Sequence, residues 1–355
     1  MRIEHFVQDW AAVKKRWEAW WQCGLYDRPV IAVTAPRDGV PPYREEKVSP
    51  ETRWTDADYM VRSRLESIRT TYFGGEALPL FFHNLAIGHA LLLGCPPRWE
   101  EESAWVDPAP VAADGYPLFD GWRENPWWPW MLESTRTAVA GSQGRYFVMP
   151  AWGNSAGDNL SLARGPQQLM LDLAENPAWV RRAAKQASDI LMDIFHDLWE
   201  LVAPERVGIE GSVNYCGCWS PGRTLSLDCD LSCMISPETF REIFLPPLIE
   251  TTHTVDHCNY HLDGWVALHH LEALLDVPEL HGIQWVPGAG REDIMQWVPL
   301  IQRIQQRRKN VTLSVRPEEI EGLLREVRPE GLYLVTTCRT EGEARALVER
   351  VAAKY

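Results

Sequence analysis

The sequence predicts an α/β fold, most simply a (β/α)8 TIM barrel formed by one domain that spans residues 1–355. Short runs rich in β-branched and apolar residues alternate along the chain with amphipathic helices. This alternation is typical of parallel strands joined by right-handed crossovers. No glycine-rich loop of the GxGxxG type follows a predicted strand, so a doubly wound open sheet is the less favoured alternative.

Eight strands are predicted, and they carry few charges, as expected for a barrel wall that is buried on both sides. They cover residues 28–36, 78–84, 145–152, 206–213, 258–263, 282–287, 311–316 and 331–337. An N-terminal amphipathic helix lies within residues 1–21. Helical spacing of apolar residues predicts further helices at 176–202, 236–255, 291–308, 316–327 and 340–355. Ser236 and Thr340 are the expected N-caps of the helices at 236–255 and 340–355.

Residues 95–145 show no clear element and are rich in proline and tryptophan, so we interpret them as an insertion that packs over one end of the barrel. Of the 18 tryptophans in the chain, six fall in this segment, and Trp122, Trp127, Trp128 and Trp130 cluster in its second half. Two interpretations stay open. These side chains fill the core and cover loops, or they form the wall of a pocket for a sugar face or a methylated ammonium ion.

The charge and cysteine content exclude several classes of protein. A net charge of −14 repels phosphate backbones, so nucleic acid is not an expected partner. No apolar run reaches the roughly 18 residues that a membrane helix needs, and the charged N-terminal helix does not resemble a signal peptide. The eight cysteines form no CxxC pair, which favours free thiols in a reducing compartment, and we expect a cytoplasmic location.

Functional side chains of a barrel come from the C-terminal ends of its strands and from the loops that follow. By position, Arg37, Asn84 and Glu210 are the catalytic candidates, at the first, second and fourth strands. A carboxylate in a barrel wall needs a partner, so Glu210 has both a functional and a structural interpretation. The same reasoning gives five candidates for substrate binding, which are Asn154, Asp158, Tyr215, Trp285 and Arg316.

His261, Asp263 and Cys338 are the candidate metal ligands. Residues i and i+2 of a strand point to the same face, so His261 and Asp263 are expected to share the barrel mouth. The eighth strand closes the barrel, which would bring Cys338 to the same opening. Imidazole, carboxylate and thiolate are all zinc ligands, and three protein ligands with one open position are typical of catalytic zinc. The alternative is a hydrogen-bonded histidine and a buried structural cysteine.

Three segments carry a resemblance to the uroporphyrinogen decarboxylase superfamily, which includes zinc-dependent methyltransferases that act with corrinoid proteins. They are "LSCMISPETFREIFLPPLIE" (231–250), "YHLDG" (260–264) and "LVTTCRTEGEARALVERV" (334–351). The methyltransferase branch carries H-x-C, a long gap and then C. The matching positions here are His261 and Asp263, then 74 intervening residues, then Cys338.

This resemblance implies a zinc-dependent methyltransferase whose partners are a small-molecule substrate, a corrinoid protein and, in a homodimer, a second copy of the chain. Asp263 stands where relatives have cysteine, which makes the metal site harder and more Lewis-acidic, or removes it. The decarboxylase branch carries an aspartate where this chain has Asn84, and an amide cannot supply the same negative charge. The remaining alternatives are a metal-free decarboxylase or lyase, which would use Arg37, Asp38, Glu210 and Arg316, and a non-catalytic barrel with a tryptophan-lined binding site.

Overall fold

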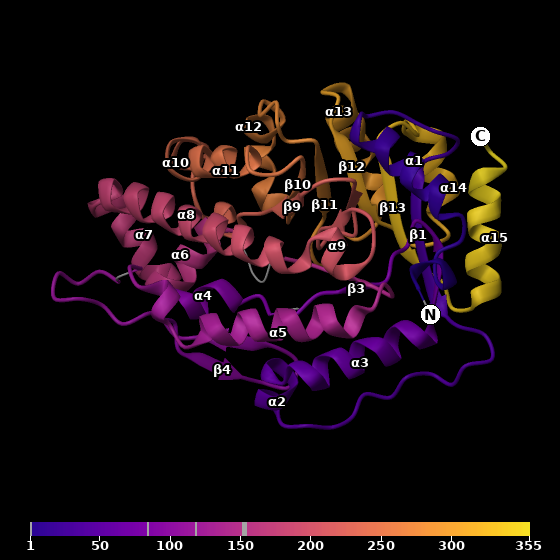
Figure 1. The fold of residues 1–355 in the computed structure, drawn as a ribbon. Coiled ribbons are helices and arrows are strands. Elements are labelled where there is room, and N and C mark those ends of the chain that lie inside the picture. The colour runs from indigo at the N-terminus through magenta and orange to yellow at the C-terminus, as the bar shows by residue number, and fades with distance from the viewer. Residues whose placement is uncertain (1, 84, 118, 151–154) are drawn as a thin grey trace.

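A computed structural model describes residues 2–83, 85–117, 119–150 and 155–355. A seven-stranded sheet extends from the centre of the molecule toward the C-terminal helix (Figure 1). The strand order is β2-β1-β13-β12-β11-β10-β9. All neighbouring strands are parallel except β1 and β2, which are antiparallel. The bounds are β1 (Val30–Pro36), β2 (Thr71–Gly75), β9 (Thr224–Leu227), β10 (His257–Asp263), β11 (Gly282–Val286), β12 (Asn310–Ser314) and β13 (Leu332–Thr337).

Three of the predicted barrel strands are reduced to two residues each. The chain forms β3 (Leu80–Phe81), which pairs with β6 (Phe147–Val148), and β7 (Ser212–Val213), which pairs with β8 (Trp219–Ser220). Pro79 and Pro150 flank β3 and β6 and cannot donate to a ladder, which keeps these strands short. No ring of hydrogen bonds closes the described strands into the predicted eight-stranded barrel, whereas the parallel α/β organisation is confirmed.

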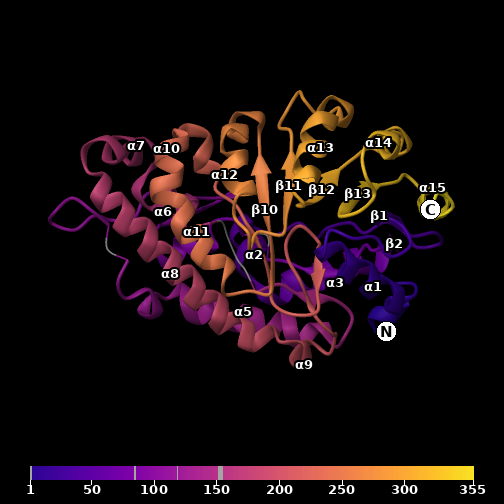
Figure 2. The same cartoon turned by 90° about the horizontal axis from the view of Figure 1, so that it is seen from above.

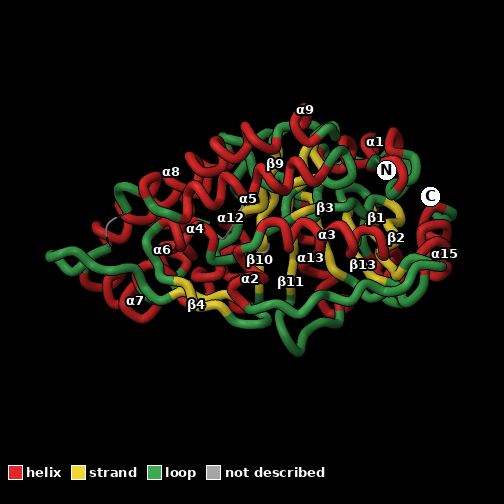
Figure 3. Tube along the Cα trace, turned by 60° about the horizontal axis from the view of Figure 1, so that its bottom comes forward, coloured by secondary structure: helices red, strands yellow, loops and turns green. Residues whose placement is uncertain are grey.

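Helices lie on both sides of the strands (Figures 2 and 3). On one side, α13 (Val298–Gln306) packs against β12, and α15 (Glu341–Ala352) packs against β1 and β2. On the other side, the long helix α8 (Pro177–Val202) packs against α5, α6, α7 and α11. The remaining helices that contain α-helical turns are α1 (Trp10–Trp21), α2 (Pro50–Thr55), α3 (Ala57–Thr70), α4 (Gly88–Leu92), α5 (Trp127–Ser142), α6 (Ala156–Arg164), α7 (Pro166–Glu175), α9 (Pro204–Val207), α10 (Pro237–Thr239), α11 (Leu245–Thr252), α12 (Leu271–Leu275) and α14 (Ile320–Glu326).

The predicted N-caps are confirmed by their hydrogen bonds. The side-chain oxygen of Ser236 accepts the N–H of Thr239 at 3.2 Å, and that of Thr340 accepts the N–H of Glu343 at 3.1 Å. Each cap satisfies an N–H group that the first helical turn leaves without an intrahelical partner. The sequence therefore specifies where the helices after β9 and β13 begin, and these two turns flank the strands that carry the candidate ligands.

The segment 95–145 is more ordered than its composition predicts. It contains a short hairpin, β4 (Pro97–Trp99) with β5 (Ala104–Val106), and the 16-residue helix α5, which packs against α3 and α8. Trp122 and Trp128 are each only 8% exposed and contact each other edge to face at 4.9 Å. Trp127 contacts Trp130 in the same way at 5.2 Å. These tryptophans therefore pack in and around the core.

The N-terminal helix α1 packs its tryptophans on the sheet. Trp17 and Trp20 are almost fully buried, and Trp17 contacts the ring of Tyr333 on β13 at 4.7 Å. Nε1 of Trp21 donates to the carbonyl of Trp219 on β8 at 2.7 Å, so α1 bridges β13 and β8. All eight cysteines are free thiols. None of the helices in the described part of the chain combines the length and the apolar character needed to cross a bilayer.

Candidate functional site

Asp230, His261 and Asp263 bring three potential metal ligands together at the carboxyl end of β10. Their ligand atoms all lie within 4.8 Å of one another. His261 and Asp263 are at i and i+2 of β10, so they share one face of the strand. Asp230 begins the 3₁₀ helix Asp230–Met234 just after β9, which pairs in parallel with β10. His261 is half-buried and both aspartates are exposed, so the group opens to solvent.

Gln284 fixes the orientation of His261. The two residues are directly paired between β10 and β11, and Nδ1 of His261 lies 2.6 Å from Oε1 of Gln284. An amide oxygen can only accept, so Nδ1 carries the proton and Nε2 keeps the lone pair that binds a metal. Histidine ligands of metal sites almost always donate their second N–H in this way. The contact therefore fits a metal-binding role for His261.

The donor set is one imidazole nitrogen and two carboxylate oxygens. Three protein ligands that leave a coordination position open are typical of catalytic zinc. Compared with a site of one histidine and two thiolates, this set is harder and favours oxygen-bearing substrates. The residues present thus fit a zinc ion, with Asp230 in the place that the sequence assigned to Cys338.

Asp158 of α6 holds the backbone of the loop that carries Asp230. Its carboxylate accepts the N–H groups of Asp230 at 2.9 Å and Leu231 at 2.7 Å, and also the hydroxyl of Ser155 at 2.9 Å. Burial and the nearby charge of Asp230 raise the pKa of Asp158 to about 6, although the three donors oppose this shift. Asp158 is predicted from the sequence to bind substrate. In the structure it positions the candidate ligand Asp230 through hydrogen bonds to the backbone.

A buried polar network supports Gln284 from the other side. Sγ of Cys216 donates to Oε1 of Gln284 at 2.9 Å, and Ser226 donates to Sγ of Cys216 at 3.0 Å. Ser226 also contacts Oδ1 of Asn259, which lies two residues before His261 on the same face of β10. Burial raises the pKa of the Cys216 thiol to about 11, so at neutral pH it stays a neutral donor. The network holds Gln284 with its oxygen toward His261.

Tyr215 is the second predicted substrate-binding residue that lies at this site. Its ring contacts the ring of His261 edge to face at 5.6 Å. Burial and the nearby Cys216 and Asp228 raise the pKa of the Tyr215 hydroxyl, which is therefore neutral at physiological pH. Tyr215 covers the imidazole from the side and limits how a substrate can approach.

Trp285 and Cys338 lie elsewhere than expected. Trp285 is 1% exposed and packs on Trp297 at 4.9 Å, because it alternates with Gln284 and so points away from His261. Cys338 is buried beside α15 and lines a surface hollow with Glu343 and Arg350. In the described part of the chain, Cys338 belongs to no group of three potential metal ligands. The predicted convergence of Cys338 with His261 is therefore absent from this structure.

Glu210, Arg37 and Arg316 are engaged by other contacts. Glu210 follows the positive-φ Gly208 that ends α9, lies before β7 instead of within it, and forms an ion pair with Lys14 at 2.5 Å. The guanidinium of Arg37 lies over the ring of Phe6 at 5.3 Å. Arg316 is exposed and pairs with Glu319 at 2.6 Å. The structure does not bring these three residues to the candidate metal ligands. The remaining two candidates, Asn84 and Asn154, lie outside the described residues.

Asp230 is the candidate metal ligand that the sequence interpretation missed. It follows β9, a four-residue strand that the strand pattern did not predict. The available signal was the run "TLSLDCD" (224–230), in which polar and apolar residues alternate and the last polar positions are two aspartates. A strand placed there would have put Asp228 and Asp230 at its carboxyl end, next to those of β10.

Comparison with known proteins gives a shared fold. No protein-family model matches the chain, and no curated protein sequence matches it. A methyltransferase from Methanosarcina mazei has a similar structure, with a TM-score of 0.61, 14% sequence identity, and an alignment that covers 96% of this chain and 98% of that one. At this identity the similarity concerns the fold, which extends over nearly the whole of both chains.

Proposed function

We propose that this protein is a zinc-dependent methyltransferase of the uroporphyrinogen decarboxylase superfamily that acts with a corrinoid protein. The observation that carries the proposal is the convergence of Asp230, His261 and Asp263 within 4.8 Å. This group contains the two positions, 261 and 263, that correspond to the H-x-C zinc ligands of the methyltransferase branch, with Asp263 in place of the cysteine. The fold shared with a methyltransferase over 96% of the chain also supports it.

In this proposal His261 and the two aspartates hold the metal, Gln284 fixes the imidazole, and Asp158 fixes the Asp230 loop. A zinc ion at this position supplies a Lewis acid that lowers the pKa of a bound thiol, alcohol or water. Tyr215 limits the approach to His261 from one side. The exposure of both aspartates leaves the site open on the side from which a methyl-carrying partner would approach.

The proposal is tested by methyl transfer from methylcobalamin, which serves as a probe for the corrinoid partner. Chelator-treated protein is assayed with and without added zinc, against a thiol and an alcohol as acceptors, and cleavage of the cobalt–carbon bond is followed by visible absorbance. We expect zinc-dependent demethylation that is lost in His261→Ala and Asp263→Asn.

Asp193→Asn is the matched control, because Asp193 is an exposed aspartate that pairs only loosely with Arg123, at 3.6 Å. It should behave as wild type. Demethylation that proceeds equally without zinc, or in His261→Ala, would contradict the proposal. Release of carbon dioxide from a carboxylated substrate by metal-free protein would instead support the decarboxylase alternative.

A further inference from the structure

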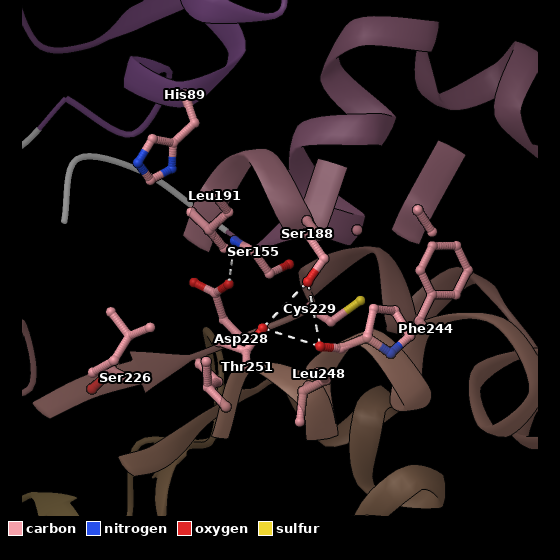
Figure 4. Close-up of a pocket in the computed structure, with 16 residues that line it drawn as sticks. His89, Ser155, Ser188, Leu191, Ser226, Asp228, Cys229, Phe244, Leu248 and Thr251 are labelled. Atoms are coloured by element: carbon pink, nitrogen blue, oxygen red, sulfur yellow. Dashed lines mark hydrogen bonds between the residues drawn. The ribbon is translucent and has the colours of Figure 1, made fainter. Parts of the chain in front are cut away.

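Two cavities of the described structure differ in size and position. The cavity shown in Figure 4 lies beside β9 and has a volume of about 40 Å³, and Asp228 in its wall stands two positions before Asp230. It therefore adjoins the candidate metal ligands. A larger pocket, of about 300 Å³, lies between the loop before α2, α2 itself, α3 and the end of β3. It shares no lining residue with the first cavity, and none of the candidate metal ligands lines it.

One face of α3 carries polar groups of the larger pocket. Positions i, i+3 and i+4 of a helix lie on one side, so Ser63, Arg64 and Ser67 reach the pocket together. The hydroxyl oxygen of Ser63 accepts from Tyr43 at 2.9 Å, and its own proton stays available for a ligand. The hydroxyl of Ser67 forms no hydrogen bond with the described residues. Two hydroxyl donors thus accompany Arg64.

Arg64 is a cation without an acidic partner in the part of the chain that the structure describes. Its Nε donates to the carbonyl of Leu80 at 2.5 Å, which holds the guanidinium at the pocket wall. No aspartate or glutamate among the described residues pairs with it. Burial lowers the pKa of Arg64, although a guanidinium stays charged at neutral pH. Its two terminal nitrogens can therefore donate side by side to one anionic group.

The remaining acidic, basic and histidine side chains of the wall leave the pocket with a net positive charge. Glu45 pairs with Arg53 at 3.0 Å and accepts the hydroxyl of Tyr59 at 3.0 Å, so its charge is compensated. His83 is buried, which lowers the pKa of its imidazole well below the ordinary value, and it is therefore neutral. Two arginines thus stand against one glutamate, in a chain whose net charge is −14. The charge of Arg64 selects an anion.

The aromatic part of the wall selects the body of that anion. Five lining side chains are tyrosine, tryptophan or phenylalanine, and Tyr43 and Phe82 are only half-buried, so part of each ring stays accessible. Such rings pack well against another ring. A volume of about 300 Å³ lies at the lower end of the range for small-molecule pockets, about 300–1,000 Å³. One unpaired guanidinium suits a singly charged carboxylate, because a second negative charge would lack a partner.

We propose that this pocket is a binding site for a small aromatic carboxylate, of which benzoate is the simplest. The carboxylate accepts from the guanidinium of Arg64 and from the hydroxyls of Ser63 and Ser67, and the ring lies against Tyr43 and Phe82. The inference is independent of the proposed function, since it requires neither zinc nor methyl transfer.

Isothermal titration calorimetry with sodium benzoate on the full-length protein tests the proposal. Sodium chloride is the ionic-strength control. Benzyl alcohol and benzylammonium keep the ring but not the negative charge, and acetate keeps the charge but not the ring. We expect saturable binding of one benzoate per chain, and binding at least about tenfold weaker for each of the other three ligands. Chelator-treated protein should bind benzoate as untreated protein does, which separates this result from the test of the zinc site.

Arg64→Gln should weaken benzoate binding by about tenfold or more. Arg62→Gln is the matched control, because Arg62 is exposed on the same helix, does not line the pocket, and removes the same charge from the chain. It should bind benzoate as wild type does.

Ser67→Leu supplies a second variant, in case the loss of the contact with Leu80 unfolds Arg64→Gln. It leaves Arg64 in place, fills part of the pocket from α3, and should also weaken benzoate binding by about tenfold or more. Circular dichroism confirms that each variant is folded. The proposal is overturned if wild type does not bind benzoate, if benzyl alcohol or acetate binds equally well, or if the folded pocket variants bind benzoate like wild type.

Discussion

Nδ1 of His261 lies 2.6 Å from Oε1 of Gln284, on two strands whose register pairs these residues directly. This contact fixes which nitrogen of the imidazole can bind a metal. It also links the group of three candidate metal ligands, Asp230, His261 and Asp263, to the buried network of Cys216 and Ser226. Gln284, Cys216 and Ser226 therefore support the candidate ligands through hydrogen bonds, and substitutions at these supporting residues can be tested separately from substitutions of the ligands.

Replacing Gln284 by alanine should weaken zinc binding by about 10–100-fold, because His261 loses the acceptor that orients it. Gln284→Glu should restore affinity, since a carboxylate accepts the same hydrogen bond. Competition with a chromophoric chelator measures both affinities. Gln302→Ala is the matched control, because Gln302 donates to a backbone carbonyl, that of Glu326. Wild-type affinity in Gln284→Ala would show that the contact has no part in metal binding.

Cys338→Ser should keep the full zinc affinity. Cys338 lies beside α15 with Glu343 and Arg350, apart from the group of Asp230, His261 and Asp263. The same chelator competition measures its effect next to His261→Ala. If Cys338→Ser lost zinc as completely as His261→Ala, Cys338 would be a ligand, and the strands would have to close further than they do in this structure.

Trp285→Ala should destabilise the protein without changing zinc affinity. The side chain is 1% exposed and packs on Trp297, so its removal leaves a cavity in the core. Such a truncation costs about 3–5 kcal/mol in the free energy of unfolding. Urea denaturation of metal-free protein measures this loss, and Trp285→Phe should recover part of it. A stable Trp285→Ala protein with impaired ligand binding would contradict this expectation and support the predicted role of Trp285 in substrate binding.

Proton binding to His281 should lower the free energy of unfolding in mild acid. Burial, together with His257 and Lys309, lowers the pKa of His281 from 6.5 to about 4. The unfolded chain therefore binds this proton at a higher pH than the native protein does. The stability linked to His281 is fully present above pH 6.5 and is lost as the pH falls from about 6.5 to 4, by on the order of 2 kcal/mol.

Urea denaturation of chelator-treated wild type and His281→Gln at a series of pH values measures this contribution. The difference between the two proteins removes the effect of Asp158, whose raised pKa acts in the opposite direction. The stability of His281→Gln should depend less on pH between 6.5 and 4. Parallel curves for the two proteins would contradict the assignment.

The regular part of the fold could be predicted because its signals are local. The strands around His261 and Thr337 and the caps at Ser236 and Thr340 are all encoded by patterns within a few residues. The closed barrel was not found because three predicted strands are only two residues long, two of them flanked by Pro79 and Pro150. Barrel closure depends on contacts between distant segments, which a local pattern does not encode.

Two of the three candidate metal ligands, His261 and Asp263, could be predicted from the sequence. The spacing of His261 and Asp263 placed both on one face of β10, as the structure shows. Asp230 was missed because β9 has only four residues, and so short an alternating run does not by itself distinguish a strand from a loop. Trp285 was predicted to bind substrate, whereas its neighbour Gln284 is the residue that contacts His261, because the sequence does not reveal which face of β11 is turned toward the candidate ligands. One position along a strand reverses the side on which a side chain lies.

The most direct measurement is anomalous X-ray scattering at the zinc edge from crystals grown with zinc. We predict one strong peak per chain that lies about 2.0–2.2 Å from Nε2 of His261 and from carboxylate oxygens of Asp230 and Asp263. A peak at Cys338 instead, or no peak at these residues in zinc-saturated crystals, would contradict it.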